Sequence, residues 1–279
     1  MKISLYVHFF DLIPAKESLL DKLNHLVIPD EKHQMYKTKS LDLILRSLKK
    51  VGVDGLELLA PSVTADKDIG KIKEIIKKYD LPVLSIHQSN SNIKSISLSE
   101  IEKLCILAKN FSAKVVTLHS DTLGDKLFDK SFILNLKEFQ TKYELQFGIE
   151  NMPKSPFSIL KPYTYEPAKF SSLINNSGLN ITLDTTHLGQ VNSSICKFYA
   201  ENKEKIINIH LSDYKISKLN RVLLLSNDTH LPLTKGELPI AEFLKLLKKD
   251  NYNGLITMEI NADLDGLCQS AETIKNAFK

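Results

Sequence analysis

Eight short apolar segments alternate with amphipathic helical segments along this chain. The apolar segments are rich in Val, Ile and Leu, as strands buried on both faces of a parallel sheet are. They span residues 2–10, 55–61, 82–88, 114–120, 146–152, 179–187, 206–213 and 254–260. Eight strand–helix repeats in succession are typical of a closed (β/α)8 barrel, so we predict an α/β protein built as one TIM barrel.

The segments between the strands carry apolar residues at every third or fourth position, the spacing of one helix face. They span residues 40–52, 68–79, 98–111, 130–143, 166–178, 193–205, 239–251 and 271–278. Gly52, Gly178 and Asn251 are expected to end three of these helices, because Gly and Asn tolerate a left-handed backbone. A doubly wound open sheet is the alternative fold, but no Gly-rich phosphate-binding turn follows the first strand.

Composition indicates a globular protein without a leader or anchor. No Gly/Ser/Pro-rich linker divides the 279 residues, and we expect a single domain over residues 1–279. The apolar run at the N-terminus is too short for a signal peptide, and none is long enough to span a membrane, which favours a cytoplasmic protein. Cys105, Cys196 and Cys268 are far apart and are expected to be reduced thiols on helices.

The net charge of +4 raises the question of a nucleic-acid partner. The basic residues are almost all lysine, with only Arg46 and Arg221 to supply the forked contacts that phosphates and bases favour. The lysines fall in helical patterns that read as solvated faces. Nucleic acid is therefore not the expected partner, although a basic groove is not excluded.

Six successive predicted strands end in residue types that bind metal ions, at the end of the barrel where reactive groups lie. These residues are His87, His119, Glu150, Asp184, His210 and Glu259. Any one of them alone reads as an ordinary solvated or hydrogen-bonded residue. Together they indicate a metal centre, because a shared cation compensates clustered carboxylates in apolar surroundings.

The period of two along a strand places the residue two before each candidate on the same side of the sheet. These six residues are Ser85, Thr117, Gly148, Thr182, Asn208 and Thr257. All of them except Gly148 can form hydrogen bonds through their side chains. Either they orient the ligands from beneath, or small residues simply fill a tapering barrel. The intervening residues Ile86, Leu118, Ile149, Leu183, Ile209 and Met258 are expected to face the helices.

The segments GIENMP, TLDTTHLGQ, NIHLSDY, HLPLTKGEL and TMEI resemble, in this order, the xylose isomerase-like TIM-barrel superfamily. The resemblance implies that one divalent cation, Mn²⁺, Co²⁺, Mg²⁺ or Zn²⁺, is bound by Glu150, Asp184, His210 and Glu259. It also implies that Glu150 and Glu259 are catalytic. They would exchange a proton with a small sugar or sugar-derived hydroxyketone through a metal-held enediolate, as an isomerase or epimerase does.

The endonuclease IV-like branch of the same superfamily implies a different reading with up to three zinc ions. His87 and His119 would join Glu150 at one metal, and Asp184, His210 and Glu259 would hold the second. The third would be held by His187, Asp228 and His230. The protein would then be an apurinic-site endonuclease or phosphodiesterase. Few arginines, and the segments IHQSNSNI and LHSDTLGD, which lack the flanking pattern of that branch, favour the isomerase or epimerase.

A second alternative is a sugar-binding barrel without catalysis, which the complete pair of glutamates disfavours. In the isomerase reading, His187 resembles the position that contacts a substrate hydroxyl, and Asp228 discriminates between the branches. Weaker substrate-binding candidates are Glu57, Lys235 and Arg221, for which a lysine partner or an ordinary surface role is the alternative. Long loops over 11–38, 152–167 and 213–238 are expected to be lids or binding walls. For the loop 152–167, a rigid surface loop or a subunit contact of a homo-oligomer is the alternative.

Overall fold

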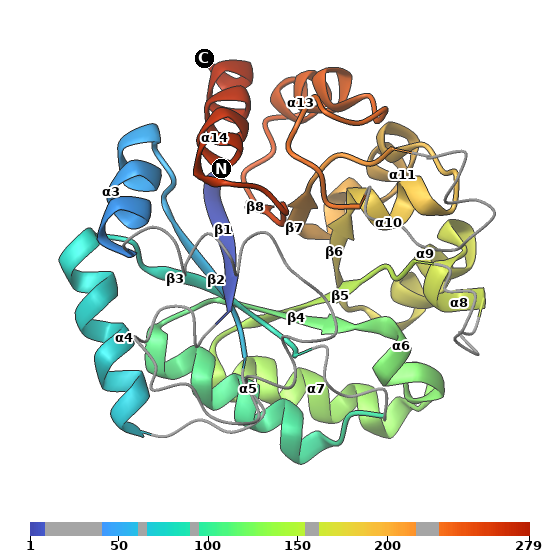
Figure 1. The fold of residues 1–279 in the computed structure, drawn as a ribbon. Coiled ribbons are helices and arrows are strands. Elements are labelled where there is room, and N and C mark those ends of the chain that lie inside the picture. The colour runs from blue at the N-terminus through green and yellow to red at the C-terminus, as the bar shows by residue number, and fades with distance from the viewer. Residues whose placement is uncertain (9–40, 61–65, 90–94, 154–161, 216–228) are drawn as a thin grey trace, which may run out of the picture.

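The computed structural model of the chain describes residues 1–8, 41–60, 66–89, 95–153, 162–215 and 229–279. Eight parallel strands form a closed barrel with the helices around it (Figure 1). The strands are β1 (Lys2–His8), β2 (Gly55–Leu59), β3 (Val83–His87), β4 (Val115–His119), β5 (Gln146–Glu150), β6 (Asn180–Asp184), β7 (Ile206–Leu211) and β8 (Leu255–Met258).

Each strand pairs with its neighbour in sequence, and the first strand closes the ring by pairing with the last. Lys2 of β1 lies opposite Leu255 of β8, and Ser4 lies opposite Thr257. The closed ring confirms the predicted (β/α)8 barrel. The alternative of an open doubly wound sheet is wrong, because such a sheet has two edge strands.

Helices connect the strands and cover the outside of the barrel (Figure 1). The longer ones are α3 (Leu41–Val51), α4 (Asp66–Tyr79), α5 (Leu98–Phe111), α7 (Lys130–Tyr143), α9 (Pro167–Ser177), α11 (Ile195–Asn202), α13 (Ile240–Lys249) and α14 (Leu264–Phe278). Short helical turns are α6 (Ser120–Leu123), η2 (Gly124–Phe128), α8 (Pro162–Tyr165), α10 (Thr185–Gln190) and η3 (Lys203–Lys205). Gly52, Gly178 and Asn251 have φ of 88°, 68° and 53°, which confirms the predicted helix stops.

Two predicted boundaries are wrong, and in both cases the cause is an aspartate that caps a helix. The strand predicted to run to residue 187 ends at Asp184, whose side chain accepts a hydrogen bond from the backbone N–H of His187 and starts α10. The last helix begins at Leu264 and not at residue 271, because Asp263 accepts from the backbone N–H of Gly266. The predicted loop 152–167 also contains the short helix α8, and the loop 11–38 lies outside the described residues.

The predicted alternation along the strands is confirmed. Ile86, Leu118, Ile149, Leu183, Ile209 and Met258 all belong to the hydrophobic core. The polar residues Ser85, Thr117, Thr182, Asn208 and Thr257 are completely buried and form hydrogen bonds with one another or with Glu57. The barrel interior is therefore polar directly beneath the strand ends, and this polar layer supports the site.

Two smaller expectations concern the cysteines and the membrane. Cys105, Cys196 and Cys268 are thiols on α5, α11 and α14, as expected. Among the described residues, no helix combines the length and apolarity that crossing a bilayer requires.

Candidate metal centre

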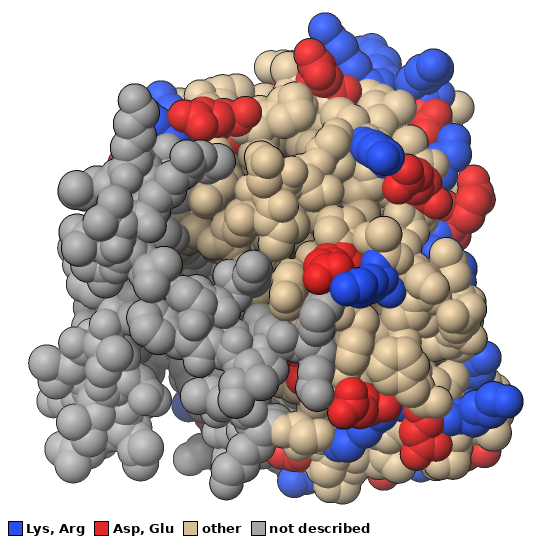
Figure 2. Space-filling view, turned by 90° about the vertical axis from the view of Figure 1, so that its right-hand side faces the viewer, with Lys and Arg blue, Asp and Glu red and all other residues tan. Residues whose placement is uncertain are grey.

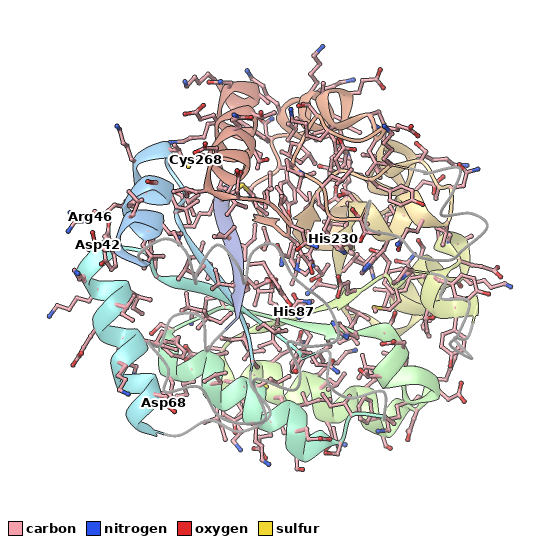
Figure 3. The ribbon with its side chains drawn as sticks, in the orientation of Figure 1. Asp42, Arg46, Asp68, His87, His230 and Cys268 are labelled. Atoms are coloured by element: carbon pink, nitrogen blue, oxygen red, sulfur yellow. The ribbon has the colours of Figure 1, made fainter. Side chains whose placement is uncertain are left out.

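The structure brings the predicted strand-end residues together at one end of the barrel. His87, His119, Glu150, Asp184 and His210 are all at least 95% buried, and the side chain of Glu259 is 17% exposed. The ring of His87 lies 4.9 Å from that of His119 and 5.2 Å from that of His210, measured between ring centroids. In Figure 3, His87 and His230 lie near the centre of the barrel, whereas Asp42 and Arg46 lie at its periphery.

Glu150 is at the centre of this group because both of its carboxylate oxygens face imidazoles. Its Oε2 lies 3.3 Å from His87 Nε2 and 3.4 Å from His119 Nε2. Its Oε1 lies 3.1 Å from His210 Nδ1 and 3.7 Å from His187 Nδ1. A carboxylate from β5 thus contacts histidines from three other strands and from α10.

The hydrogen-bonding pattern of His87 bears on what can lie between its ring and the carboxylate of Glu150. Nδ1 of His87 lies 2.7 Å from the backbone carbonyl of Gln88, which only accepts, so Nδ1 carries the proton. In the neutral ring Nε2 is then an acceptor, and it faces the acceptor Oε2 of Glu150. Two facing acceptors repel unless a proton or a metal cation lies between them.

His210 presents the same arrangement to two carboxylates. Its Nδ1 lies 3.1 Å from Glu150 Oε1 and 2.9 Å from Glu259 Oε2. Asp184 Oδ2 is a buried oxygen without a hydrogen-bond partner among the described residues, and Glu259 Oε2 has the 2.9 Å contact with His210 Nδ1 outside hydrogen-bond geometry. Buried carboxylate oxygens and imidazole nitrogens that converge without donors fit a divalent cation.

These contacts shift the pKa values of the buried carboxylates and of His210. Burial opposes ionisation, yet His210 and His87 hold the pKa of Glu150 well below its usual value. Burial likewise opposes ionisation of Glu259, whose pKa is held low by His230 and His210. For His210, burial favours the neutral ring, but Glu57, Glu150 and Glu259 raise its pKa well above the usual value. Asp184 differs, because burial raises its pKa to about 7.

The candidate ligand atoms form two groups. This grouping matches neither the predicted single-cation set nor the predicted three-zinc set. The first group is His87, Glu150, His210 and Glu259, with atoms within 4.8 Å of one another, and the second is Asp184, His187 and His230. Asp184 is turned toward α10, since its Oδ1 caps that helix. Asp228, the predicted third-metal ligand, lies outside the described residues.

Two residues that sequence reasoning missed hold the ligands from the side. The Asn151 side chain accepts a hydrogen bond from Asp184 N at 2.8 Å and donates to Asp184 O at 3.1 Å, which fixes the end of β6. The Gln88 side chain accepts from His119 N at 3.0 Å. Each directly follows a strand-end ligand, and that position was the available signal in the sequence.

The weaker candidates lie in different environments. Glu57 is completely buried among Ser85, Asn208 and His210, so the alternative of a lysine partner is wrong. Lys235 is exposed on the segment after residue 229, and Arg221 lies outside the described residues.

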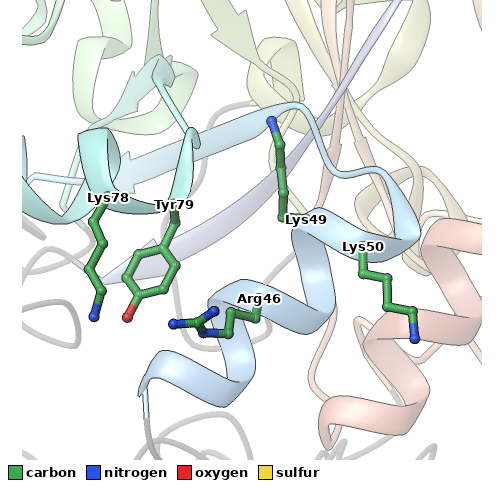
Figure 4. A pocket seen from close by; sticks show the side chains of 5 residues that line it. All are labelled: Arg46, Lys49, Lys50, Lys78 and Tyr79. Carbon is green, nitrogen blue, oxygen red and sulfur yellow. The ribbon is translucent and has the colours of Figure 1, made fainter.

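A basic cavity of about 370 Å³ lies on the outside of the barrel, away from the strand ends. It is lined by Arg46, Lys49, Lys50, Lys78 and Tyr79, from α3 and α4 (Figure 4). Asp42 accepts hydrogen bonds from three of these side chains, and Asp80 pairs with Lys49, so two carboxylates offset part of the charge of the four basic side chains. On the molecular face in Figure 2, acidic and basic side chains are likewise interspersed.

Comparison with known protein families shows which family this barrel belongs to. Residues 45–277 match the family described as xylose isomerase-like TIM barrel. The chain belongs to this family. The predicted resemblance to the xylose isomerase-like superfamily is thereby confirmed.

Three proteins similar to this chain illustrate the family. An inosose dehydratase of Mesomycoplasma hyopneumoniae (strain 7448) is 25% identical over 251 residues, covering 80% of this chain and 82% of its own. The structure of a D-tagatose 3-epimerase-like protein aligns with a TM-score of 0.68 at 19% identity, covering 99% and 97% of the two chains. A xylose isomerase-like protein from Mycobacterium smegmatis in complex with magnesium aligns with a TM-score of 0.61 at 16% identity, covering 84% and 88%.

Proposed function

We propose that the protein is a divalent-metal-dependent isomerase or epimerase of a small sugar or sugar-derived hydroxyketone. The observation that carries the proposal is the position of His210 Nδ1 within 3.1 Å of carboxylate oxygens from both Glu150 and Glu259. Two carboxylates from β5 and from the end of β8 thereby meet at one ligand atom. Names of relatives, an inosose dehydratase and a D-tagatose 3-epimerase-like protein, support a polyhydroxylated carbonyl substrate.

The cation would be held by Glu150, His210 and Glu259, whose ligand atoms lie in the first group above, together with Asp184 from the second group. When bound, it supplies Lewis acidity that makes the C–H beside a substrate carbonyl easier to deprotonate. Asp184 contributes its Oδ2, the oxygen that has no donor among the described residues.

Glu150 and Glu259 are suited to move the proton. The pKa of each is lowered by neighbouring imidazoles, so both are carboxylates at neutral pH and each can accept a proton from the substrate carbon. Their surroundings differ, because the side chain of Glu150 is 2% exposed and that of Glu259 is 17% exposed. A proton taken by Glu259 therefore exchanges with solvent more readily than one taken by Glu150.

Deuterium exchange tests this proposal. We expect Mn²⁺-loaded protein in D₂O to place deuterium on the carbon beside the carbonyl of a ketose from a panel that includes D-tagatose and inosose. The isosteric variants Glu150→Gln and Glu259→Gln remove the proton acceptors and are expected to lose this exchange. Glu138→Gln, on the exposed face of α7, is the matched control and should retain it. Full exchange in either site variant, or none across the panel with wild-type protein, contradicts the scheme.

A second candidate function, zinc-dependent hydrolysis of a phosphodiester, is favoured by one specific observation. His87 and His119 both direct Nε2 at Glu150 Oε2, and a single-cation isomerase site does not need them. With the second group of Asp184, His187 and His230, the residues suit more than one cation. Cleavage of abasic-site DNA by zinc-loaded protein, lost in His119→Ala and absent with magnesium, would support this function over the first.

A further inference from the structure

The ring of His210 is oriented in the opposite way from those of three other histidines at the site. In each of those three, Nδ1 faces a backbone carbonyl, which leaves Nε2 with the lone pair. The pairs are His87 with Gln88 O at 2.7 Å, His187 with Asn151 O at 2.8 Å and His230 with Glu259 O at 3.2 Å. For His210 it is Nδ1 that faces Glu150 and Glu259, and so its Nε2 needs a different partner.

That partner is Glu57, a carboxylate on β2 across the barrel. Glu57 Oε1 lies 2.8 Å from His210 Nε2, and both side chains are completely buried. The contact departs from ideal hydrogen-bond geometry, and neither atom has another hydrogen-bond partner among the described residues. Glu57 has no route to a substrate above the strand ends, because its exposed fraction is zero. A buried carboxylate carries a large desolvation cost, which favourable contacts of Glu57 must offset.

A chain of hydrogen bonds fixes the orientation and polarity of the Glu57 carboxylate. Its Oε2 accepts from Ser85 Oγ at 2.5 Å and from Asn208 Nδ2 at 2.9 Å. Asn208 Oδ1 accepts from Thr257 Oγ1 at 2.9 Å, and Ser4 Oγ lies 2.7 Å from Thr257 Oγ1. Because the hydroxyl hydrogen of Thr257 is used on Asn208, Ser4 donates to Thr257.

This network defines the direction of every donor in it. The amide of Asn208 is oriented by a donor on one side and a carboxylate on the other, so its nitrogen must face Glu57. Oε2 of Glu57 is thus fully used by donors from β3 and β7. The remaining oxygen, Oε1, is held toward His210 Nε2 and can only accept.

We propose that Glu57 is a positioning residue that keeps the proton of His210 on Nε2 and so reserves Nδ1 as the metal ligand. A carboxylate behind a ligating imidazole fixes the tautomer and the ring orientation and makes the ligand more basic. The inference rests on the proposed metal centre but not on which reaction the centre catalyses. It assigns Glu57 a role toward the cation, in place of the substrate contact expected from the sequence.

The substitution Glu57→Gln tests this role because it reverses the polarity at one atom. Ser85 and Asn208 both donate, so the glutamine carbonyl takes the place of Oε2 and its NH₂ group faces His210 Nε2. The ring is then driven to carry its proton on Nδ1, where the cation would bind. We expect a 10- to 100-fold weaker affinity for Mn²⁺ or Zn²⁺ in competition titrations.

Nitrogen-15 NMR of histidine side chains in the zinc-loaded protein provides a readout that a merely structural role would not change. Wild-type His210 is expected to show a protonated Nε2 and a metal-bound Nδ1. Ser4→Ala, at the far end of the same network, is the matched control and should bind cations within about twofold of wild type. Thermal unfolding of the metal-free proteins establishes that all variants are folded.

Different outcomes separate this inference from the proposed function. Wild-type protein that binds no divalent cation would overturn the metal centre itself. A folded Glu57→Gln variant with wild-type cation affinity, or a wild-type His210 with its proton on Nδ1, would overturn the role of Glu57 alone. Loss of cation binding in Ser4→Ala as large as in Glu57→Gln would show that the network acts only through packing, and would also overturn it.

Discussion

At the residue scale, the protonation of the site couples metal binding to pH. Burial raises the pKa of Asp184 to about 7, and three carboxylates raise the pKa of His210 well above its usual value despite its burial. Both groups therefore hold protons as the pH falls below neutrality, and a cation must displace them. The carboxylates of Glu150 and Glu259 do not oppose this trend, because their pKa values are lowered.

We accordingly predict that affinity for Mn²⁺ rises with pH between about 6 and 8 and that binding releases protons. The expected change is up to tenfold per pH unit for each proton released. Calorimetric titrations in buffers of different ionisation enthalpy measure both quantities. An affinity that is constant or increases toward pH 6 would contradict the assigned protonation states.

Gly148 illustrates how closely the inner layer of the barrel is packed. A Cβ at this position would lie 2.2 Å from Thr182 Oγ1 on the neighbouring strand. We predict that Gly148→Ala lowers the free energy of unfolding by about 1–3 kcal/mol, the usual cost of overpacking a core. Gly70→Ala is the control, since an added Cβ there would have no contact within 4 Å apart from its own stretch of α4 among the described residues. This substitution should stabilise α4 by about 1 kcal/mol. Urea denaturation distinguishes the two; equal effects would show that space at Gly148 is not limiting.

The strand-end ligands could be predicted because strand periodicity and barrel architecture together define one end and one side of each strand. The partners of Glu57 could not, because Asn208 is 151 residues away and its contact depends on the closure of the barrel. Sequence reasoning therefore placed His210 in the candidate site but did not anticipate its contact with Glu57. The division of ligand atoms into two groups was equally hidden, since it depends on side-chain rotation.

At the scale of elements, one aspartate attaches the segment after residue 229 to the end of β7. Asp213 is buried, and its side chain accepts from the backbone N–H groups of Tyr214, Gly236 and Leu238. Its backbone also pairs with Leu231 in an isolated antiparallel bridge. This attachment holds the segment that carries His230 against the site.

We predict that Asp213→Asn loosens this segment without unfolding the barrel, because one acceptor oxygen becomes an NH₂ group that faces a backbone donor. The amides of Gly236 and Leu238 should exchange with deuterium faster, while that of Ile209 within β7 stays protected. Asp129→Asn, which alters the cap of α7, is the control and should leave Gly236 and Leu238 unchanged. Unaltered exchange at both amides in Asp213→Asn would show that Asp213 does not hold the segment.

Element boundaries were the least predictable part of the fold. The β-branched Thr185 and Thr186 after Asp184 suit a strand by composition but lie buried in α10, so the sequence pattern placed the end of β6 too late. The aspartate decided the outcome by capping the helix. The order and type of the eight strands, in contrast, followed from repeated patterns that no single cap could alter.

At the scale of the whole molecule, the barrel brings candidate ligands from five strands and from the residue after β8 to one place, and the proposed metal centre would therefore link cation binding to the stability of the fold. Repulsion between facing acceptors, as at His87 and Glu150, is relieved only when a positive charge is present. A ligand that binds only the folded state raises its stability in proportion to the logarithm of its concentration.

The number of cations held by each chain tests the proposed metal centre directly. Native mass spectrometry of protein loaded with Mn²⁺ and then freed of excess ion provides the count, with Glu150→Gln and Glu138→Gln measured in parallel. The account predicts one tightly held cation in wild type and in Glu138→Gln, and none in Glu150→Gln. Wild-type protein that retains no cation, or one that retains three, would contradict it.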